Sequence, residues 1–133
     1  MTTTFKAIQP AWTKGALLIV FIVIGDIVAR KAGVAGSEKL LFFVWGLFMV
    51  AVFVSTYTAP QHKLIVGMSH TLTISLLFAL SNRIQSLYGI GVDIGGAKGF
   101  GAVFALIYVT SFIPALIAAV AGLLFSAKRD KAT

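Results

Sequence analysis

Residues 16–24 read ALLIVFIVI, an unbroken apolar run at the centre of a longer hydrophobic segment. Three further segments of the same kind follow along the chain. A helix needs about 20 residues, at a rise of 1.5 Å each, to cross the hydrocarbon core of a bilayer. The four segments are therefore predicted to be membrane spans within a single membrane domain, residues 1–133. Their predicted bounds are 12–29, 40–58, 64–82 and 99–127.

Composition indicates the same class of protein. The 133 residues are 59% hydrophobic and 11% charged, and the mean hydropathy is +0.98. A soluble domain has about 45–50% apolar and about 25% charged residues, and one of this size cannot hide so much apolar surface. A soluble enzyme and a disordered tail are therefore excluded, and the lack of cysteine excludes a disulfide scaffold. Short connections favour antiparallel neighbours, so we expect an all-α integral membrane protein, a four-transmembrane-helix antiparallel bundle.

The formal charge is +7, from eleven Lys and Arg residues and four Asp and Glu residues. The basic residues lie at the ends of the apolar segments, where they meet lipid headgroups, and membrane lipid is therefore an expected partner. They form no basic stripe with interleaved aromatic side chains, so nucleic acid is not an expected partner.

Six of the Lys and Arg residues fall on the side of both chain termini, and five fall on the other side. The positive-inside rule counts these residues, and the cluster KRDK at 128–131 favours termini in the cytoplasm. We expect the protein in the inner (cytoplasmic) membrane of a bacterium. Because the division is nearly equal, two copies inserted in opposite directions are an alternative.

Small residues form a stripe on each of the last two predicted spans. Membrane helices associate where Gly, Ala, Ser and Thr let their backbones approach closely, so both stripes are predicted to be helix-packing faces. The first stripe has a spacing of four residues, and the second alternates four and three around Tyr108 and Phe112. The packing residues are Gly67, Thr71, Ser75 and Ala79, followed by Gly101, Ala105, Ala115, Ala119 and Gly122.

Pro114 lies inside the last predicted span. A proline has no backbone N–H and crowds the carbonyl four residues earlier, here that of Thr110. The last helix is therefore predicted to be kinked near Pro114. We interpret the kink as static, and a hinge for gating is the alternative.

Ionisable side chains inside a membrane are functional candidates. Asp26 lies near the end of the first span with Arg30 four residues on, so we expect an ion pair, and a proton or cation site is the alternative. His70 lies two turns into the third span, and we expect a buried imidazole bonded to a neighbouring helix, with a proton relay as the alternative. Asp93 lies in a glycine-rich loop, 82–98, which is either an ordinary turn or a re-entrant lining of a pathway.

The sequence contains no Ser/His/Asp triad, no paired carboxylates and no helical HExxH motif, so we expect neither catalysis nor a cofactor or metal site. The first functional hypothesis is a small structural subunit that packs into a larger membrane assembly for transport, secretion or energy conversion. The second is a self-assembling ion channel or transporter with Asp26 and His70 near the pathway. The expected protein partners are copies of the chain or other membrane subunits, and a pore-forming lysis protein is a third possibility.

Overall fold

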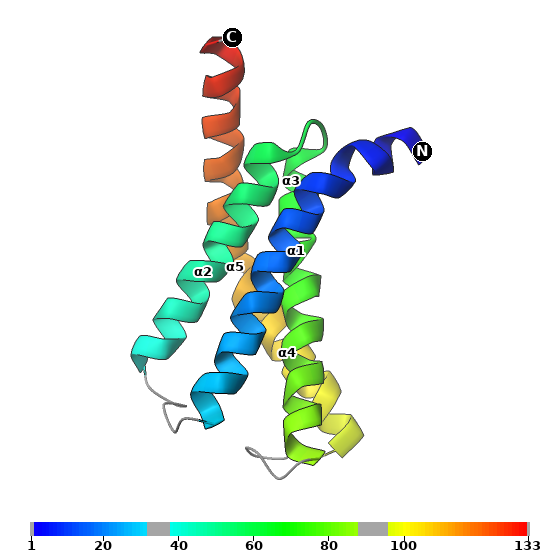
Figure 1. Cartoon of the computed structure of the whole chain (residues 1–133), viewed down its shortest axis with the longest axis vertical. Helices are drawn as coiled ribbons and strands as arrows, with labels where there is room; N and C mark the ends of the chain where they lie inside the picture. The colour runs from blue at the N-terminus through cyan, green and yellow to red at the C-terminus, as the bar shows by residue number, and fades with distance from the viewer. Residues whose placement is uncertain (1, 32–37, 88–95, 133) are drawn as a thin grey trace.

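The computed structural model of the chain describes residues 2–31, 38–87 and 96–132, and the side chains within 5–29, 42–84 and 99–131. Over these residues the chain is helical and contains no strand (Figure 1). The elements are α1 (Thr2–Lys31), α2 (Glu38–Thr58), α3 (Lys63–Met68), α4 (His70–Leu87) and α5 (Gly96–Ala132). The expectation of an all-α fold is confirmed.

Among the described residues, three helical stretches are long and apolar enough to cross a membrane: Phe5–Ala29, Lys63–Ile84 and Gly99–Lys131. A shorter apolar helix covers Phe42–Thr58. Large apolar side chains cover the outside, while nine polar or charged residues are buried inside. This distribution is the reverse of that in a soluble protein and is compatible with a helical membrane bundle.

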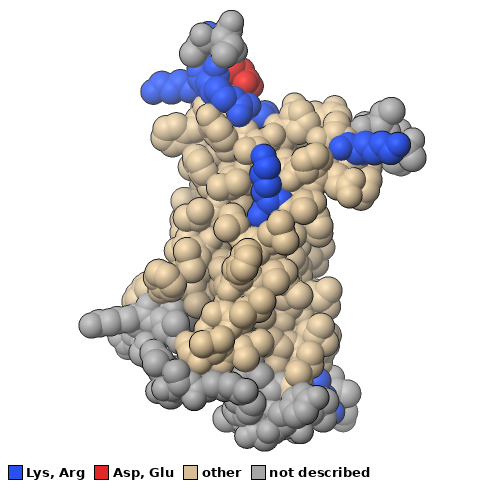
Figure 2. Space-filling model, viewed as in Figure 1, with Lys and Arg blue, Asp and Glu red and all other residues tan. Residues whose placement is uncertain are grey.

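The helices run side by side, with α4 and α2 packed along α5 and α1 packed along α2 (Figure 1). The start of α1, the end of α2, the start of α3 and the end of α5 lie at one end of the bundle. We call it the basic end, and Figure 2 shows Lys and Arg gathered there above a broad uncharged surface. Its described basic residues are Lys6, Lys14, Lys63, Lys128, Arg129 and Lys131.

Helix α1 begins at Thr2, ten residues before the predicted start of the first span at 12. Polar residues interrupt the apolar pattern there, which argues against a span but not against a helix outside the hydrocarbon layer. Pro10 lies inside α1, and its missing N–H breaks the helical ladder at that turn. The segment before Pro10, which we call the N-terminal arm, leans away from the bundle (Figure 1).

The third predicted span is divided into α3 and α4 at Ser69. The Ser69 hydroxyl donates to the Val66 carbonyl oxygen at 2.7 Å, and the Thr71 hydroxyl donates to the Met68 carbonyl oxygen at 2.8 Å. Side chains that bond to nearby backbone carbonyls compete with the regular helix, which accounts for the interruption at this place.

Helix α5 continues through Pro114. The Thr110 hydroxyl donates to the carbonyl oxygens of Leu106 and Ile107 at 2.8 and 3.3 Å, and the Ser111 hydroxyl donates to Tyr108 at 3.1 Å. These bonds cluster in the turn before the proline, where the helical ladder loses a donor. The kink near Pro114 stays a prediction.

Three helices approach closely around Thr56 of α2. A Cβ atom added to Gly122 of α5 would lie 3.0 Å from the Phe53 carbonyl oxygen and 3.0 Å from the Thr56 Cβ. A Cβ atom added to Gly67 of α3 would overlap the Thr56 hydroxyl oxygen. Thr56 therefore fits between two glycines, and the lack of a side chain on both brings three helices together.

We predict that Gly122→Ala and Gly67→Ala destabilise the protein by about 1–3 kcal/mol, because the added methyl group overpacks this contact. The measurement is the apparent melting temperature of the purified protein in detergent. Gly46→Ala is the matched control, because a Cβ atom at Gly46 meets nothing within 4 Å. Thr56→Ala should restore stability to Gly67→Ala, and equal melting temperatures for all the glycine variants would contradict the prediction.

Candidate functional site

His70 is the centre of a polar cluster at the junction of three helices. Its side chain is fully buried at the start of α4, and its Nε2 lies 2.8 Å from the Ser55 hydroxyl of α2. The Ser55 hydroxyl also donates to the Ala11 carbonyl oxygen of α1 at 2.9 Å. A serine has one hydroxyl proton, so when Ser55 donates it to Ala11, the serine oxygen accepts from Nε2–H of His70.

Trp12 covers the imidazole from α1. The two rings stack with centroids 5.6 Å apart and planes inclined by 20°. The indole N–H of Trp12 donates to the Ser69 hydroxyl at 3.0 Å, and that hydroxyl donates onward to Val66. We call His70, Ser55, Trp12 and Ser69 the histidine cluster, and it ties α1, α2 and the α3–α4 junction together.

Gly15 provides the space that the imidazole occupies. A Cβ atom at Gly15 would overlap Nε2 of His70 and would lie 2.9 Å from the Ser55 hydroxyl oxygen. The histidine side chain therefore packs directly on the backbone of α1. This contact is a second close approach of helices, in addition to the one around Thr56.

The Nδ1 atom of His70 is buried and has no hydrogen-bond partner within the described residues. In the arrangement given above, Nδ1 carries the free lone pair of the imidazole and can accept a proton or a hydrogen bond. The Ser55–His70 pair resembles two members of a catalytic triad. Both side chains are fully buried, however, and no described carboxylate orients Nδ1, so the pair lacks the geometry of an activated nucleophile.

Three other buried hydroxyls bond to backbone carbonyl oxygens three or four residues earlier in the chain. Thr56 donates to Val52 at 2.8 Å, and Ser75 donates to Thr71 at 2.5 Å. Thr71 donates to Met68, as described above. These groups are satisfied locally, so they fill space between helices as small residues do and do not connect into a relay across the bundle.

Asp26 is also buried, with 7% of its surface exposed, and it makes an interaction within the structure. It lies 26 − 12 = 14 residues beyond Trp12 on α1, which corresponds to about 21 Å along the helix axis. Asp26 and His70 therefore do not share one site. The Arg30 side chain and Asp93 lie outside the described residues, so the Asp26–Arg30 ion pair and the role of Asp93 stay predictions.

The first predicted packing stripe faces the interior. Its four residues are buried: Gly67, Thr71, Ser75 and Ala79. Those of α4 lie on a helix that packs along α5. The stripe is therefore covered within the chain and does not form an outer surface.

The second predicted stripe is divided. Ala115, Ala119 and Gly122 are buried, whereas Gly101 and Ala105 are exposed. Tyr108 and Phe112 are also exposed, with 36% and 45% of their surface accessible to solvent. We call Gly101, Ala105, Tyr108 and Phe112 the open seam. Figure 1 shows the reason: α2 and α5 meet near the basic end and lie far apart at the other end.

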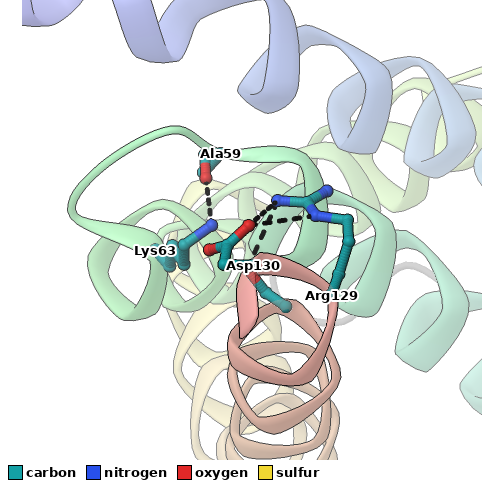
Figure 3. A network of polar contacts seen from close by, with 5 residues as sticks. Ala59, Lys63, Arg129 and Asp130 are labelled. Carbon is teal, nitrogen blue, oxygen red and sulfur yellow. Dashed lines mark hydrogen bonds and ion pairs between the residues drawn. The ribbon is translucent and has the colours of Figure 1, made fainter. Parts of the chain in front are cut away.

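Aromatic and charged contacts hold α2 and α5 together at the basic end. The rings of Phe53 and Phe125 lie 5.8 Å apart, and the guanidinium of Arg129 lies 4.5 Å from the centroid of the Tyr57 ring. Two other contacts at this end do not join α2 to α5. Arg129 donates to its neighbour Asp130 at 3.3 Å, and Lys63 donates to the Ala59 carbonyl oxygen at 2.5 Å (Figure 3). Cation–π contacts of this exposure contribute about 0.5–1 kcal/mol each.

Ser55 and Gly15 were not predicted to be partners of His70. The sequence does indicate that Ser55 faces the interior, because polar residues are few in the strongly apolar α2 and a polar residue in a membrane helix faces the interior. No comparable signal existed for Gly15, because a single glycine in an apolar helix does not show which side chain it faces.

No protein-family model, curated protein or solved structure matches this chain. Within the described residues no group of three or more His, Cys, Asp or Glu side chains is placed to hold a metal ion.

We predict that Ser55→Ala destabilises the protein by about 1–3 kcal/mol, because the buried Nε2–H of His70 loses its acceptor. Thr58→Ala is the matched control on the same helix, since the Thr58 hydroxyl donates to the Val54 carbonyl oxygen of its own helix at 2.7 Å. Melting temperatures in detergent measure both changes. The Ser55→Ala/His70→Leu double variant should lose less than the sum of the single losses, and strict additivity would refute the coupling.

Proposed function

We propose that the chain is a small membrane subunit that packs sideways, through the open seam, against a helix outside this chain. Its role is structural rather than catalytic, as part of a larger assembly for transport, secretion or energy conversion. The observation that supports the proposal is the division of the α5 seam. One half of a face that combines small residues with Tyr108 and Phe112 is closed by α2, and the other half is exposed.

The spacing of the seam explains why the exposed half suits a second helix. The positions 101, 105, 108 and 112 continue the alternation of four and three that leads to Ala115, Ala119 and Gly122. In the closed half this face brings α5 against the backbone of α2 at Gly122. A Cβ atom at Gly101 meets nothing within 4 Å, so the same close approach is available to another helix.

The proposal includes four crossings of the bilayer. Helix α2 has 21 residues, which corresponds to about 32 Å of helix and matches a hydrocarbon core of about 30 Å. The charge of the basic end favours its location on the cytoplasmic side of a bacterial inner membrane, together with both termini. An even number of crossings agrees with termini on one side.

Cysteine cross-linking tests the proposal, because the chain contains no cysteine of its own. Ala105→Cys should form a covalent adduct of defined mass in native membranes with a bifunctional thiol reagent or an oxidant. Thr110→Cys is the matched control, because it is exposed on the opposite face of α5 at a similar depth. Ala105→Leu should abolish co-purification of the partner, and Thr110→Leu should retain it.

The mass of the adduct distinguishes a copy of this chain from a different subunit, and both support a packing role for the open seam. Equal cross-linking from Ala105→Cys and Thr110→Cys, or none from either, would overturn the proposal.

A self-assembling channel or transporter is the second candidate. The observation that favours it is the pair of buried ionisable residues, Asp26 and His70, on helices that span the membrane, together with the unpartnered Nδ1 of His70. Because Asp26 lies about 21 Å along α1 from Trp12, which stacks on His70, the two ionisable residues would act as separate sites on a path between copies.

Under the second candidate, the purified chain should form a defined oligomer and conduct an ion in liposomes. Asp26→Asn and His70→Asn should each abolish the flux while insertion and oligomer state stay unchanged. Conduction by the chain without other subunits would exclude the purely structural role, and absence of flux from a correctly inserted oligomer would exclude the channel.

A further inference from the structure

We infer that a crevice at the basic end, between α1 and α3, binds an acyl chain of an anionic phospholipid, whose headgroup is held by Lys6 and Lys63. The crevice has a volume of about 260 Å³. This inference is independent of the open seam, which lies on α5, whereas no described α5 residue lines the crevice.

The walls of the crevice are mostly apolar. Phe5, Ile8, Gln9 and Trp12 line it from α1, and Ile65 and Val66 line it from α3. Ser69 and Trp12 also reach it, but the indole N–H and the serine hydroxyl bond to each other and to Val66. These groups leave water few hydrogen-bond partners at the walls, whereas a chain of methylene groups fits them.

The crevice lies where headgroups meet acyl chains. Trp12 is a tryptophan near the end of an apolar segment, as is typical of the membrane interface. Just before it, Pro10 interrupts α1 and the N-terminal arm leans away from the bundle (Figure 1). Phe5 and Ile8 on the arm contribute to the crevice, so the arm forms part of its rim at this level.

The positive charge of the basic end favours a lipid headgroup of negative charge. Lys6 lies on the arm between Phe5 and Ile8, and Lys63 is two residues before Ile65. The described charged side chains of the basic end are six Lys and Arg residues and Asp130, and Asp130 pairs with Arg129 (Figures 2 and 3). Lys63 donates one N–H to the Ala59 carbonyl oxygen, so two of its three N–H groups are left for a headgroup. Lysines adjacent in sequence to residues that line an apolar crevice are complementary to a phosphate headgroup with negative net charge above an acyl chain.

The test uses the fluorescence of Trp12 in a Trp45→Phe variant, which leaves Trp12 as the sole tryptophan of the chain. The full chain is reconstituted into phosphatidylcholine vesicles that contain either brominated phosphatidylglycerol or brominated phosphatidylcholine at equal mole fraction. Bromine on the acyl chain quenches a tryptophan in contact with it. We expect several-fold stronger quenching by the anionic lipid at low mole fraction, and equal quenching by both lipids would overturn the inference.

Two pairs of variants separate a site from general attraction to a charged surface. Lys6→Gln with Lys63→Gln should abolish the preference for the anionic lipid. Lys128→Gln with Lys131→Gln removes the same charge from exposed positions on α5 and should preserve the preference. Equal loss of preference in both pairs would mean surface attraction without a site, and would overturn the inference.

A further variant tests the crevice itself. Ile65→Phe adds volume at a residue that is 69% exposed, so folding is not at risk, and it should reduce quenching by the anionic lipid to the level of phosphatidylcholine. Leu18→Phe makes a similar addition in a second crevice, between α1 and α2, and is the matched control that should change nothing. Unchanged quenching in Ile65→Phe would overturn the inference.

Discussion

The structure depends on close approach between helices at positions without a side chain. In lipid, burying apolar surface between helices gains little, because acyl chains are as apolar as the residues they replace. Association then relies on tight packing and on polar contacts inside the bundle. This chain provides both at two places: the His70 imidazole packs on Gly15 and bonds to Ser55, and Thr56 fits between Gly67 and Gly122.

These two contacts explain why small and polar residues are buried in the interior of the bundle. They use small and polar residues for packing within the chain, and the other hydroxyls described above bond to nearby backbone carbonyl oxygens. The exception is Nδ1 of His70, which is buried without a partner in the described residues. An interior that is otherwise satisfied favours a role in which the outer surface contacts other molecules.

The two ends of the bundle present different surfaces to other molecules. At the basic end α2 closes the seam of α5, and an apolar crevice lies between α1 and α3 near Trp12. Toward the other end α2 and α5 separate, and the open seam is exposed (Figure 1). A lipid at one end and a helix at the other would not compete for the same surface. Both proposals therefore apply to one molecule in one orientation.

Much of the fold was predictable because its causes are local. The length of an apolar run and the period of the helix are properties of neighbouring residues, so the helices and the two small-residue stripes are visible in the sequence. Local causes also explain two of the differences from the predicted spans. The arm before Pro10 is helical although it is polar, and the helix breaks at Ser69 because hydroxyls bond to the adjacent carbonyls.

The sequence by itself therefore determined that the chain is helical, apolar enough for a membrane, and equipped with small-residue faces. Only the tertiary structure decided which partner each face has. Ser55 and His70 are 15 residues apart on different helices, and the α5 seam is half open because α2 crosses it at an angle. Such pairings depend on how whole helices are oriented, and that orientation results from packing among all of them rather than from any local pattern.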